Sequence, residues 1–299
     1  MTKTRIFTLS CAAIFTTAAY SQTWVSGSTG NDAASCTRTA PCKTFQRAVN
    51  VTPAWGQVSV ADPGDFGSVT ITTSMTIDGG NFASNVTTSG TSITVNTGSG
   101  IVQLRNLSVH GNGASAGIHF TSGAQLVIEN VKVNGFGSAC ISALLTAAAD
   151  IVIKDTSIDN CSGYGITIQG PQALTAEISN THVHYANGGL AVFNGTVTVS
   201  NSSFSSPSGD TGQTTGILGS SDGGNSNVLI DNCTITGFGG AIAVVGNAGN
   251  SIQVSRSTIS NTFDALSYAV GTSLISNGNN TFFNNVSLNN GFSKTVVLQ

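Results

Sequence analysis

Leu104-Arg105-Asn106-Leu107-Ser108-Val109-His110-Gly111 decides the fold, because close variants of this stretch recur along the chain. The next two are Ile128-Glu129-Asn130-Val131-Lys132-Val133-Asn134-Gly135 and Ile153-Lys154-Asp155-Thr156-Ser157-Ile158-Asp159-Asn160. Seven units align on a central polar residue, namely Asn106, Asn130, Asp155, Asn180, Asn201, Asn232 and Arg256. The intervals are 24, 25, 25, 21, 31 and 24 residues, with a mean of 25. A period of this length indicates a solenoid in which each repeat is one coil.

Each unit predicts three short strands. Two alternating runs flank the central polar residue, and an apolar cluster follows at Ile118, Ile141, Ile166, Leu190, Ile217, Ile242 and Leu266. Alternation directs inward the residues two and four before the central residue and those one and three after it. We expect the central residues to form a hydrogen-bonded ladder in a turn, and the glycine after the second strand to form a tight corner. From Gly56, roughly nine coils spaced about 4.8 Å apart predict a rod about 45 Å long.

Composition narrows the class of protein. Only 8% of the 299 residues are charged, and 36 are glycine. These values exclude a coiled coil, a charged disordered chain and an ordinary helical enzyme. The net charge of -3 becomes -5 without Lys3 and Arg5, and no basic patch is present, so we expect no nucleic-acid partner.

The N-terminal residues predict an export signal. Lys3 and Arg5 precede an uncharged apolar stretch, and Ala19-Tyr20-Ser21 provides a cleavage site. We assign residues 1–21 to a signal peptide and expect a secreted or periplasmic protein. No later apolar run reaches 18 residues, so we expect no integral membrane segment after signal removal.

Export permits disulfides, and five cysteines remain after the signal. Cys36 and Cys42 bracket a short loop and are predicted to pair, whereas the pairing of Cys140, Cys161 and Cys233 stays open. There is no CxxC motif, and no histidine lies near the first pair in the sequence, so we expect neither a metal nor another cofactor.

The repeats resemble the right-handed parallel β-helix of the pectin-lyase-like superfamily over about the whole mature chain. The opening also resembles that of secreted bacterial right-handed β-helix repeat proteins of undefined function. It carries Thr23-Trp24-Val25-Ser26-Gly27, then Cys42-Lys43-Thr44-Phe45, then Asp62-Pro63-Gly64-Asp65-Phe66-Gly67. This resemblance implies an all-β scaffold of three sheets with an N-terminal helical cap, and it implies no particular reaction.

We accordingly divide the chain into a cap over 22–55, a β-helix over 56–292 and a C-terminal tail over 293–299. An open end of a β-helix exposes both core and strand edges, which a cap must cover. Thr39, followed by Pro41, predicts the start of a helix whose apolar face carries Phe45, Ala48 and Val49. Trp24 and Trp55 are expected to seal the margins of this cap.

Polar residues gather on the outward side of the strand after the central residue. Two neighbouring columns are predicted. The first contains Ser108, Lys132, Ser157, His182, Ser203, Thr234 and Thr258. The second contains His110, Asn134, Asp159, His184, Ser205, Thr236 and Ser260. Asp159 and His184 would be neighbours across one coil spacing, where the carboxylate can orient the imidazole.

This face suggests a polysaccharide lyase that acts by β-elimination. His184 or His182, with Asp159, would supply the general base, Lys132 would neutralise a uronate carboxylate, and Tyr185 would be the acid. His110, Asn134 and Tyr185 would contact substrate, and Phe136, Tyr164 and Tyr185 are the aromatic candidates for sugar stacking. Hydrolysis is disfavoured because it needs two carboxylates, and Asp159 has no evident second one.

The alternative is that these side chains only solubilise a wall rich in hydroxyl groups. Arg105, Glu129 and Lys154 on the preceding strand are predicted to form a structural charge ladder, and His119 is expected to be solvated. Two functions therefore remain: an exported protein that interacts with an extracellular or cell-envelope polysaccharide, or a non-catalytic structural or adhesion module of the envelope. The sequence leaves the oligomeric state open.

Overall fold

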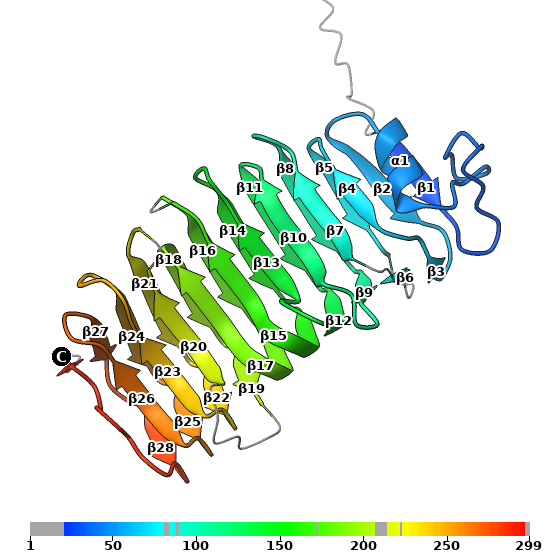
Figure 1. Cartoon of the computed structure of the whole chain (residues 1–299). Coiled ribbons are helices and arrows are strands. Elements are labelled where there is room, and N and C mark those ends of the chain that lie inside the picture. Colours follow the sequence, from blue (N-terminus) through cyan, green and yellow to red (C-terminus); the bar gives the residue numbers. More distant parts are fainter. Residues whose placement is uncertain are drawn as a thin grey trace, which may run out of the picture.

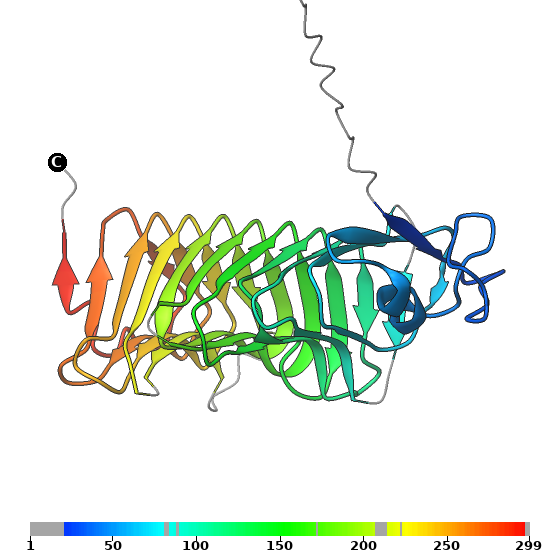
Figure 2. The ribbon, with the colours of Figure 1, turned by 90° about the horizontal axis from the view of Figure 1, so that it is seen from above.

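The computed structural model describes residues 21–80, 84–87, 90–171, 173–206, 214–221 and 223–296. The predicted signal peptide, apart from Ser21, lies outside these residues. The chain winds coil by coil into a rod, with its single described helix at the N-terminal end (Figure 1). Figure 2 shows the coils stacked along the rod, with parallel strands running across its axis.

The first strands of successive coils form one parallel sheet, which we call the first sheet. Its order is β1 (Gln22–Val25), β2 (Gly56–Val60), β5 (Met75–Asp78), β8 (Ile101–Arg105), β11 (Gln125–Glu129), β14 (Asp150–Lys154), β16 (Thr175–Ser179), β18 (Gly195–Ser200), β21 (Ser226–Asp231), β24 (Ser251–Ser255), β27 (Ser273–Ser276) and β29 (Lys294–Thr295).

The second strands follow the turn that holds the central polar residue. They are β3 (Gly64–Asp65), β6 (Ser84–Thr87), β9 (Ser108–His110), β12 (Lys132–Phe136), the starts of β15 (Ser157–Gln169) and β17 (His182–Phe193), β19 (Ser203–Ser205), β22 (Thr234–Thr236), β25 (Thr258–Ser260) and β28 (Thr281–Phe283).

The third strands complete each coil. They are β4 (Val69–Ile71), β7 (Thr91–Asn96), β10 (Ala116–Ser122), β13 (Ile141–Leu144), the ends of β15 and β17, β20 (Thr215–Ser220), β23 (Gly240–Val244) and β26 (Asp264–Tyr268). Because β15 and β17 run through both positions, the second and third strands share one continuous sheet. The predicted three strands per coil are confirmed.

The core follows the predicted alternation. Around Asn106, the inward residues Val102, Leu104, Leu107 and Val109 are each at most 2% exposed. Every coil buries the same positions, and those two and four before and three after the central residue are mostly Val, Ile and Leu. The position directly after the central residue is aliphatic in the first two units and becomes a buried Thr, Ser or Cys in the later ones, namely Thr156, Thr181, Ser202, Cys233 and Ser257.

The central polar residues form the predicted ladder, and they share a conformation that the repeat pattern did not reveal. All seven have a left-handed backbone, with φ between 45° and 56°. Asn tolerates this region better than most residues. Asn130 Nδ2 donates to Asn106 Oδ1 at 2.8 Å, and Asn106 Nδ2 donates to Asp78 Oδ1 at 2.8 Å. The ladder therefore links neighbouring coils at a corner where the backbone would otherwise be strained.

A second left-handed column lies five residues after the first. It contains Gly135 (φ 81°), Asn160 (55°), Tyr185 (52°), Gly237 (79°) and Asn261 (53°). Glycine suits this corner because it has no Cβ to clash, as the sequence predicted. Tyr185 is the bulky exception.

The cap helix α1 spans Phe45–Val51. It begins later than predicted from Thr39 and Pro41, because the Thr44 side chain caps it by accepting a hydrogen bond from Arg47 N at 3.1 Å. The predicted face is confirmed, since Phe45, Ala48 and Val49 are buried.

The two tryptophans differ in their surroundings. Trp24 is half-buried beneath the Arg38 guanidinium, 5.1 Å from the ring centroid. Trp55 is 62% exposed, so the prediction that it seals the cap is wrong.

The motifs of the N-terminal opening contact one another. Asp62 accepts hydrogen bonds from Ser26 Oγ at 2.6 Å and from Gly27 N at 2.6 Å. The Ser26 bond is the main reason that the pKa of Asp62 lies below its ordinary value. The carboxylate thereby clamps the loop after β1 onto the next coil.

Two disulfides are present among the described residues, Cys36–Cys42 as predicted and Cys140–Cys161. Cys233 is a buried free thiol. Within the described part of the chain, no helix has the length and hydropathy needed to cross a membrane.

Candidate functional site

Strand pairing places the predicted columns in register on the second strands. Lys132 pairs with Ser157, which pairs with His182. His110 pairs with Asn134, which pairs with Asp159, and Asp159 pairs with His184. We call the outward surface formed by His110, Lys132, Asn134, Asp159, His182, His184 and Tyr185 the histidine face.

Asp159 and His184 make the closest charged contact of this face. Asp159 Oδ1 lies 3.3 Å from His184 Nδ1, and Asp159 Oδ2 accepts a hydrogen bond from Ser157 Oγ at 3.0 Å. The two side chains are 36% and 48% exposed, respectively. A carboxylate at Nδ1 favours the tautomer that carries its proton there, which leaves Nε2 as the basic nitrogen. The arrangement can therefore orient His184 as a base toward solvent.

Tyr185 packs its ring edge-on against His184, with ring centroids 3.9 Å apart. It is 52% exposed and has a left-handed backbone. A bulky residue in this conformation costs free energy that the fold must compensate elsewhere. The phenol consequently stands beside the imidazole on a corner that glycine or asparagine fills in other coils.

Lys132, His182 and His110 occupy the remaining exposed positions of the face. His182 Nδ1 shares a hydrogen bond with Ser203 Oγ at 2.8 Å. Ser157 lies between Lys132 and His182 in register, so their backbones stand two strand spacings apart, about 9.6 Å. Lys132 and His182 are therefore not register neighbours, because one strand separates them along the rod.

The Cys140–Cys161 disulfide supports the backbone behind Asp159. The sulfurs of Cys140 and Cys161 lie 3.8 and 3.7 Å from the Asp159 carbonyl oxygen. Cys161 also pairs in register with Phe136 of the preceding coil and Ala186 of the next. The sequence left this pairing open, because its 21-residue separation brings the two sulfurs together only once the coils are stacked.

Two of the three proposed stacking aromatics do not serve. Phe136 is 1% exposed and belongs to the core. Tyr164 is half-buried, and desolvation raises the pKa of its phenol despite a hydrogen bond with Thr215. Of the three, Tyr185 is the one that is exposed.

The other charged residues are placed as follows. The first sheet places Arg105, Glu129 and Lys154 in register as predicted, and Lys154 Nζ lies 2.9 Å from Glu129. Arg105 Nε instead pairs with Asp78, at 2.8 Å, a partner that the prediction did not include. The expectation that His119 is solvated is wrong: it is half-buried, and desolvation lowers the pKa of its imidazole although the Ser142 backbone partly offsets this.

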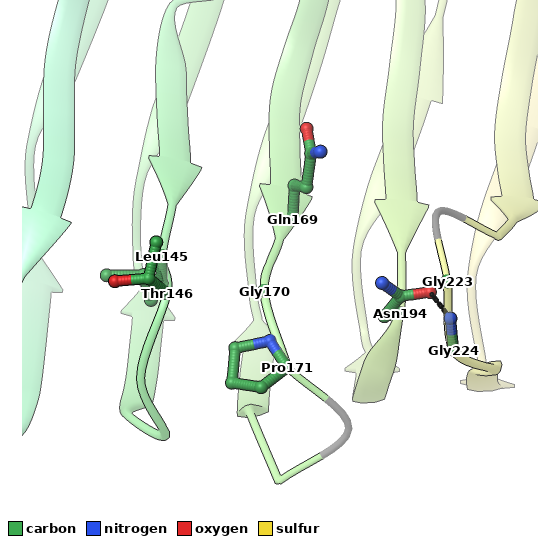
Figure 3. Close-up of a pocket in the computed structure, with 8 residues that line it drawn as sticks. All are labelled: Leu145, Thr146, Gln169, Gly170, Pro171, Asn194, Gly223 and Gly224. Carbon is green, nitrogen blue, oxygen red and sulfur yellow. Dashed lines mark hydrogen bonds between the residues drawn. The ribbon is translucent and has the colours of Figure 1, made fainter.

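The cavities that we describe lie away from the histidine face. One of about 430 Å³ follows the ends of the third strands and is bordered by Leu145, Gln169, Pro171 and Asn194 (Figure 3). Asn194 Oδ1 accepts a hydrogen bond from Gly224 N at 3.0 Å across this hollow, shown dashed in Figure 3. Two smaller hollows, of about 190 and 230 Å³, lie on the first sheet. In the described residues, no three His, Cys, Asp or Glu side chains gather as metal ligands would.

Comparison with known proteins agrees with this architecture. A family profile described as "Right handed beta helix region" matches residues 60–204. A search of curated protein sequences gave no match.

Solved structures share the fold at low sequence identity. A GH136 lacto-N-biosidase from Eubacterium ramulus superposes with a TM-score of 0.65 at 11% identity, over 93% of this chain and 67% of that one. A rhamnogalacturonan lyase gives 0.58 at 12% identity, over 92% and 89% of the two chains. Pectate lyase Pel9A gives 0.57 at 14% identity, over 93% and 78%.

The profile match, the three strands per coil and these superpositions define the class of protein. The chain folds as a right-handed parallel β-helix, the architecture that it shares with the rhamnogalacturonan lyase and the pectate lyase. At this level of identity the superpositions establish the fold, and the chemistry has to be argued from the residues of this chain.

Proposed function

We propose that this protein is exported and binds an acidic extracellular or cell-envelope polysaccharide along the histidine face, where it cleaves the chain by β-elimination. The observation that carries the proposal is the contact of His184 Nδ1 with Asp159 Oδ1 at 3.3 Å, beside the exposed Tyr185 ring. The carbohydrate-active proteins that share the fold support the substrate class.

Each residue has a defined part in the proposed reaction. His184 Nε2 takes the proton from the carbon next to the uronate carboxylate, while Asp159 stabilises the resulting imidazolium. The Lys132 ammonium pairs with that carboxylate or with the one on the neighbouring sugar unit. Tyr185 gives its phenolic proton to the leaving glycosidic oxygen as the carbon–oxygen bond breaks and the carbon–carbon double bond forms. His110, Asn134 and His182 contact the flanking sugar units.

The test uses the mature chain with polygalacturonate, rhamnogalacturonan and alginate. We expect new reducing ends together with the ultraviolet absorbance of unsaturated uronates. His184→Ala should lower the rate by a factor of about 10² to 10⁴, the usual contribution of a general base. His119→Ala is the matched control, because it removes a histidine from the third strand and should leave the rate unchanged. Reducing ends without absorbance would contradict elimination.

The second candidate function is a non-catalytic structural or adhesion module of the envelope. The exposure of the histidine face favours it, since His110, Lys132, His182 and His184 all present their side chains to solvent. Beyond His184 the column continues in register with Ser205, Thr236 and Ser260, of which Ser205 and Thr236 are partly exposed and Ser260 is buried. Retention on the acidic polysaccharides without any cleavage would favour this function over a lyase.

A further inference from the structure

Trp55 occupies a backbone position that normally requires glycine. Gly56 N donates to the Pro53 carbonyl at 3.0 Å, which closes a turn with Trp55 as its third residue. The φ of Trp55 is +67°, the left-handed value that this place in a type II turn demands. The indole is 62% exposed, so burial of the side chain does not explain its presence there.

A hollow opens beside this indole on the first sheet. The register pairs Gly56 with Met75 and Met75 with Val102, so Trp55, Ser74 and Ile101 precede these residues in one column. Trp55 N donates to the Ser74 carbonyl at 2.6 Å, and Ser74 Oγ accepts from Ile101 N at 3.1 Å. Ser74 is small and turned into the backbone, which leaves a gap of two strand spacings, about 9.6 Å, between the larger residues.

The lining of the hollow combines apolar and polar groups. Its volume is about 190 Å³, and Trp55, Met75, Thr76, Ile101 and Gln103 border it. Ile101 is 37% exposed and borders the gap on the side away from Trp55. Thr76 and Gln103 pair in register and bring a hydroxyl and an amide to the same place.

The charge near the hollow is balanced. Arg105, two residues beyond Gln103, is bound to Asp78 through a contact of 2.8 Å. The Gln103 amide itself donates to Glu129 at 3.3 Å. A ligand that fits this setting therefore has an apolar face for the indole, a rim of hydroxyl groups for Thr76 and Gln103, and no net charge.

We propose that the hollow binds one neutral sugar unit of a polysaccharide, with its C–H face stacked on Trp55. A pyranose ring has the required apolar face and hydroxyl rim, and tryptophan supplies the largest aromatic surface for such stacking. The proposal rests on the carbohydrate class of the proposed function. It places a separate binding site on the first sheet, whereas the histidine face lies on the second strands.

The test follows the fluorescence of Trp55. In a Trp24→Phe background Trp55 is the one remaining tryptophan. The probes are hexasaccharides of xylose, mannose, galactose and glucose, with hexagalacturonate as the acidic comparison. At least one neutral hexasaccharide should quench or blue-shift the emission. Calorimetry on the otherwise native mature chain should then show an affinity loss of tenfold or more for Trp55→Gly, and a smaller loss for Trp55→Phe.

Stability and assembly measurements keep the result interpretable. Glycine adopts the left-handed turn without strain, so Trp55→Gly should melt at or above the temperature of the native chain, and lost binding then cannot be ascribed to unfolding. The proposal is overturned if no neutral probe changes the emission, or if Trp55→Gly binds them like the native chain. It is also overturned if Trp55→Gly changes only the oligomeric mass, which would mark a protein contact.

The two proposals fail separately. His184→Ala should bind the neutral hexasaccharides with the affinity of the native chain. Trp55→Gly should cleave bound acidic polysaccharide at the rate of the native chain. Neutral binding that persists when no acidic polysaccharide is bound or cut would retain the Trp55 site and reject the histidine face.

Discussion

Removal of the Cys140–Cys161 disulfide tests how the histidine face is held in place. The bridge closes a loop of 22 residues, given its sequence separation of 21. In the chain-entropy treatment, such a loop restricts the unfolded chain by about 3.4 kcal/mol at 25 °C. The Cys36–Cys42 bridge, with a separation of 6, closes a much shorter loop and contributes about 2.4 kcal/mol.

The assay is urea unfolding of the mature chain and of a Cys140→Ala, Cys161→Ala double variant, followed by far-ultraviolet circular dichroism. We expect the free energy of unfolding to fall by about 3.4 kcal/mol, with a further small loss from the buried volume of the sulfurs. The Cys36→Ala, Cys42→Ala pair is the matched control and should lose about 1 kcal/mol less. Cleavage by the Cys140–Cys161 variant, measured well below its unfolding midpoint, should also fall because Asp159 loses its support.

This prediction is tested by which of the two disulfides contributes more to the free energy of unfolding. If removal of the Cys36–Cys42 pair costs more than removal of the Cys140–Cys161 pair, loop closure does not govern the contribution of these bridges. An unchanged cleavage rate in the Cys140→Ala, Cys161→Ala variant would show that stacking of the coils alone positions Asp159.

Three further predictions concern single side chains. Asn130→Ala should lower the free energy of urea unfolding by about 2 kcal/mol, because it removes the hydrogen bond to Asn106 and leaves an alanine in the left-handed backbone at φ 51°. Asn130→Gly should lower it by about 1 kcal/mol, because glycine adopts this backbone without strain. Tyr185→Gly should raise the free energy of unfolding by about 1 kcal/mol while it weakens retention on acidic polysaccharide, and a loss of stability would show that the phenol packs more strongly than its exposure suggests. Desolvation raises the pKa of the Cys233 thiol to about 11, so the folded state keeps a proton that the unfolded thiol loses near pH 8.5. The free energy of unfolding should therefore fall by roughly 2 to 3 kcal/mol as the pH rises from about 8.5 to about 11. The Cys233→Ala variant should lack this part of the pH dependence.

The coil architecture could be predicted from the sequence because a solenoid repeats its signal. Each of the seven units independently places Val, Ile or Leu at inward positions, and the same register then fixes which outward residues become neighbours. The contact between Asp159 and His184 follows from that register without any knowledge of side-chain rotamers. The helix start was misplaced because it depends on one local bond, from Arg47 N to Thr44 Oγ1, which the pattern does not encode.

Irregular features of the surface could not be predicted in the same way. The sequence predicts Phe136 as a loop aromatic, but it is the last residue of β12, and its ring packs over Gly111, the corner glycine of the preceding coil, and is buried. His119 is half-buried between its register neighbours Thr94 and Ser142, and it forms a hydrogen bond with the Ser142 backbone. The hollow beside Trp55 arises because the small Ser74 lies between the larger Trp55 and Ile101. A difference in size at one residue does not repeat along the chain, so the repeat pattern could not predict it.

The residues that have a left-handed backbone although they are not Gly, Asn or Asp are the most informative part of this repeat protein. Among the described residues, those with a left-handed backbone that are neither Gly, Asn nor Asp are Cys36, Trp55, Tyr185 and Arg256. Cys36 is held by its disulfide, and Arg256 is bound to the Asp231 carboxylate of the neighbouring coil. The side chains of Trp55 and Tyr185 form neither a disulfide nor an ion pair with the described residues, and both present more than half of their surface to solvent. Strain that the fold does not need for its own stability persists where the side chain is used, and these two rings stand at the two sites proposed for sugar.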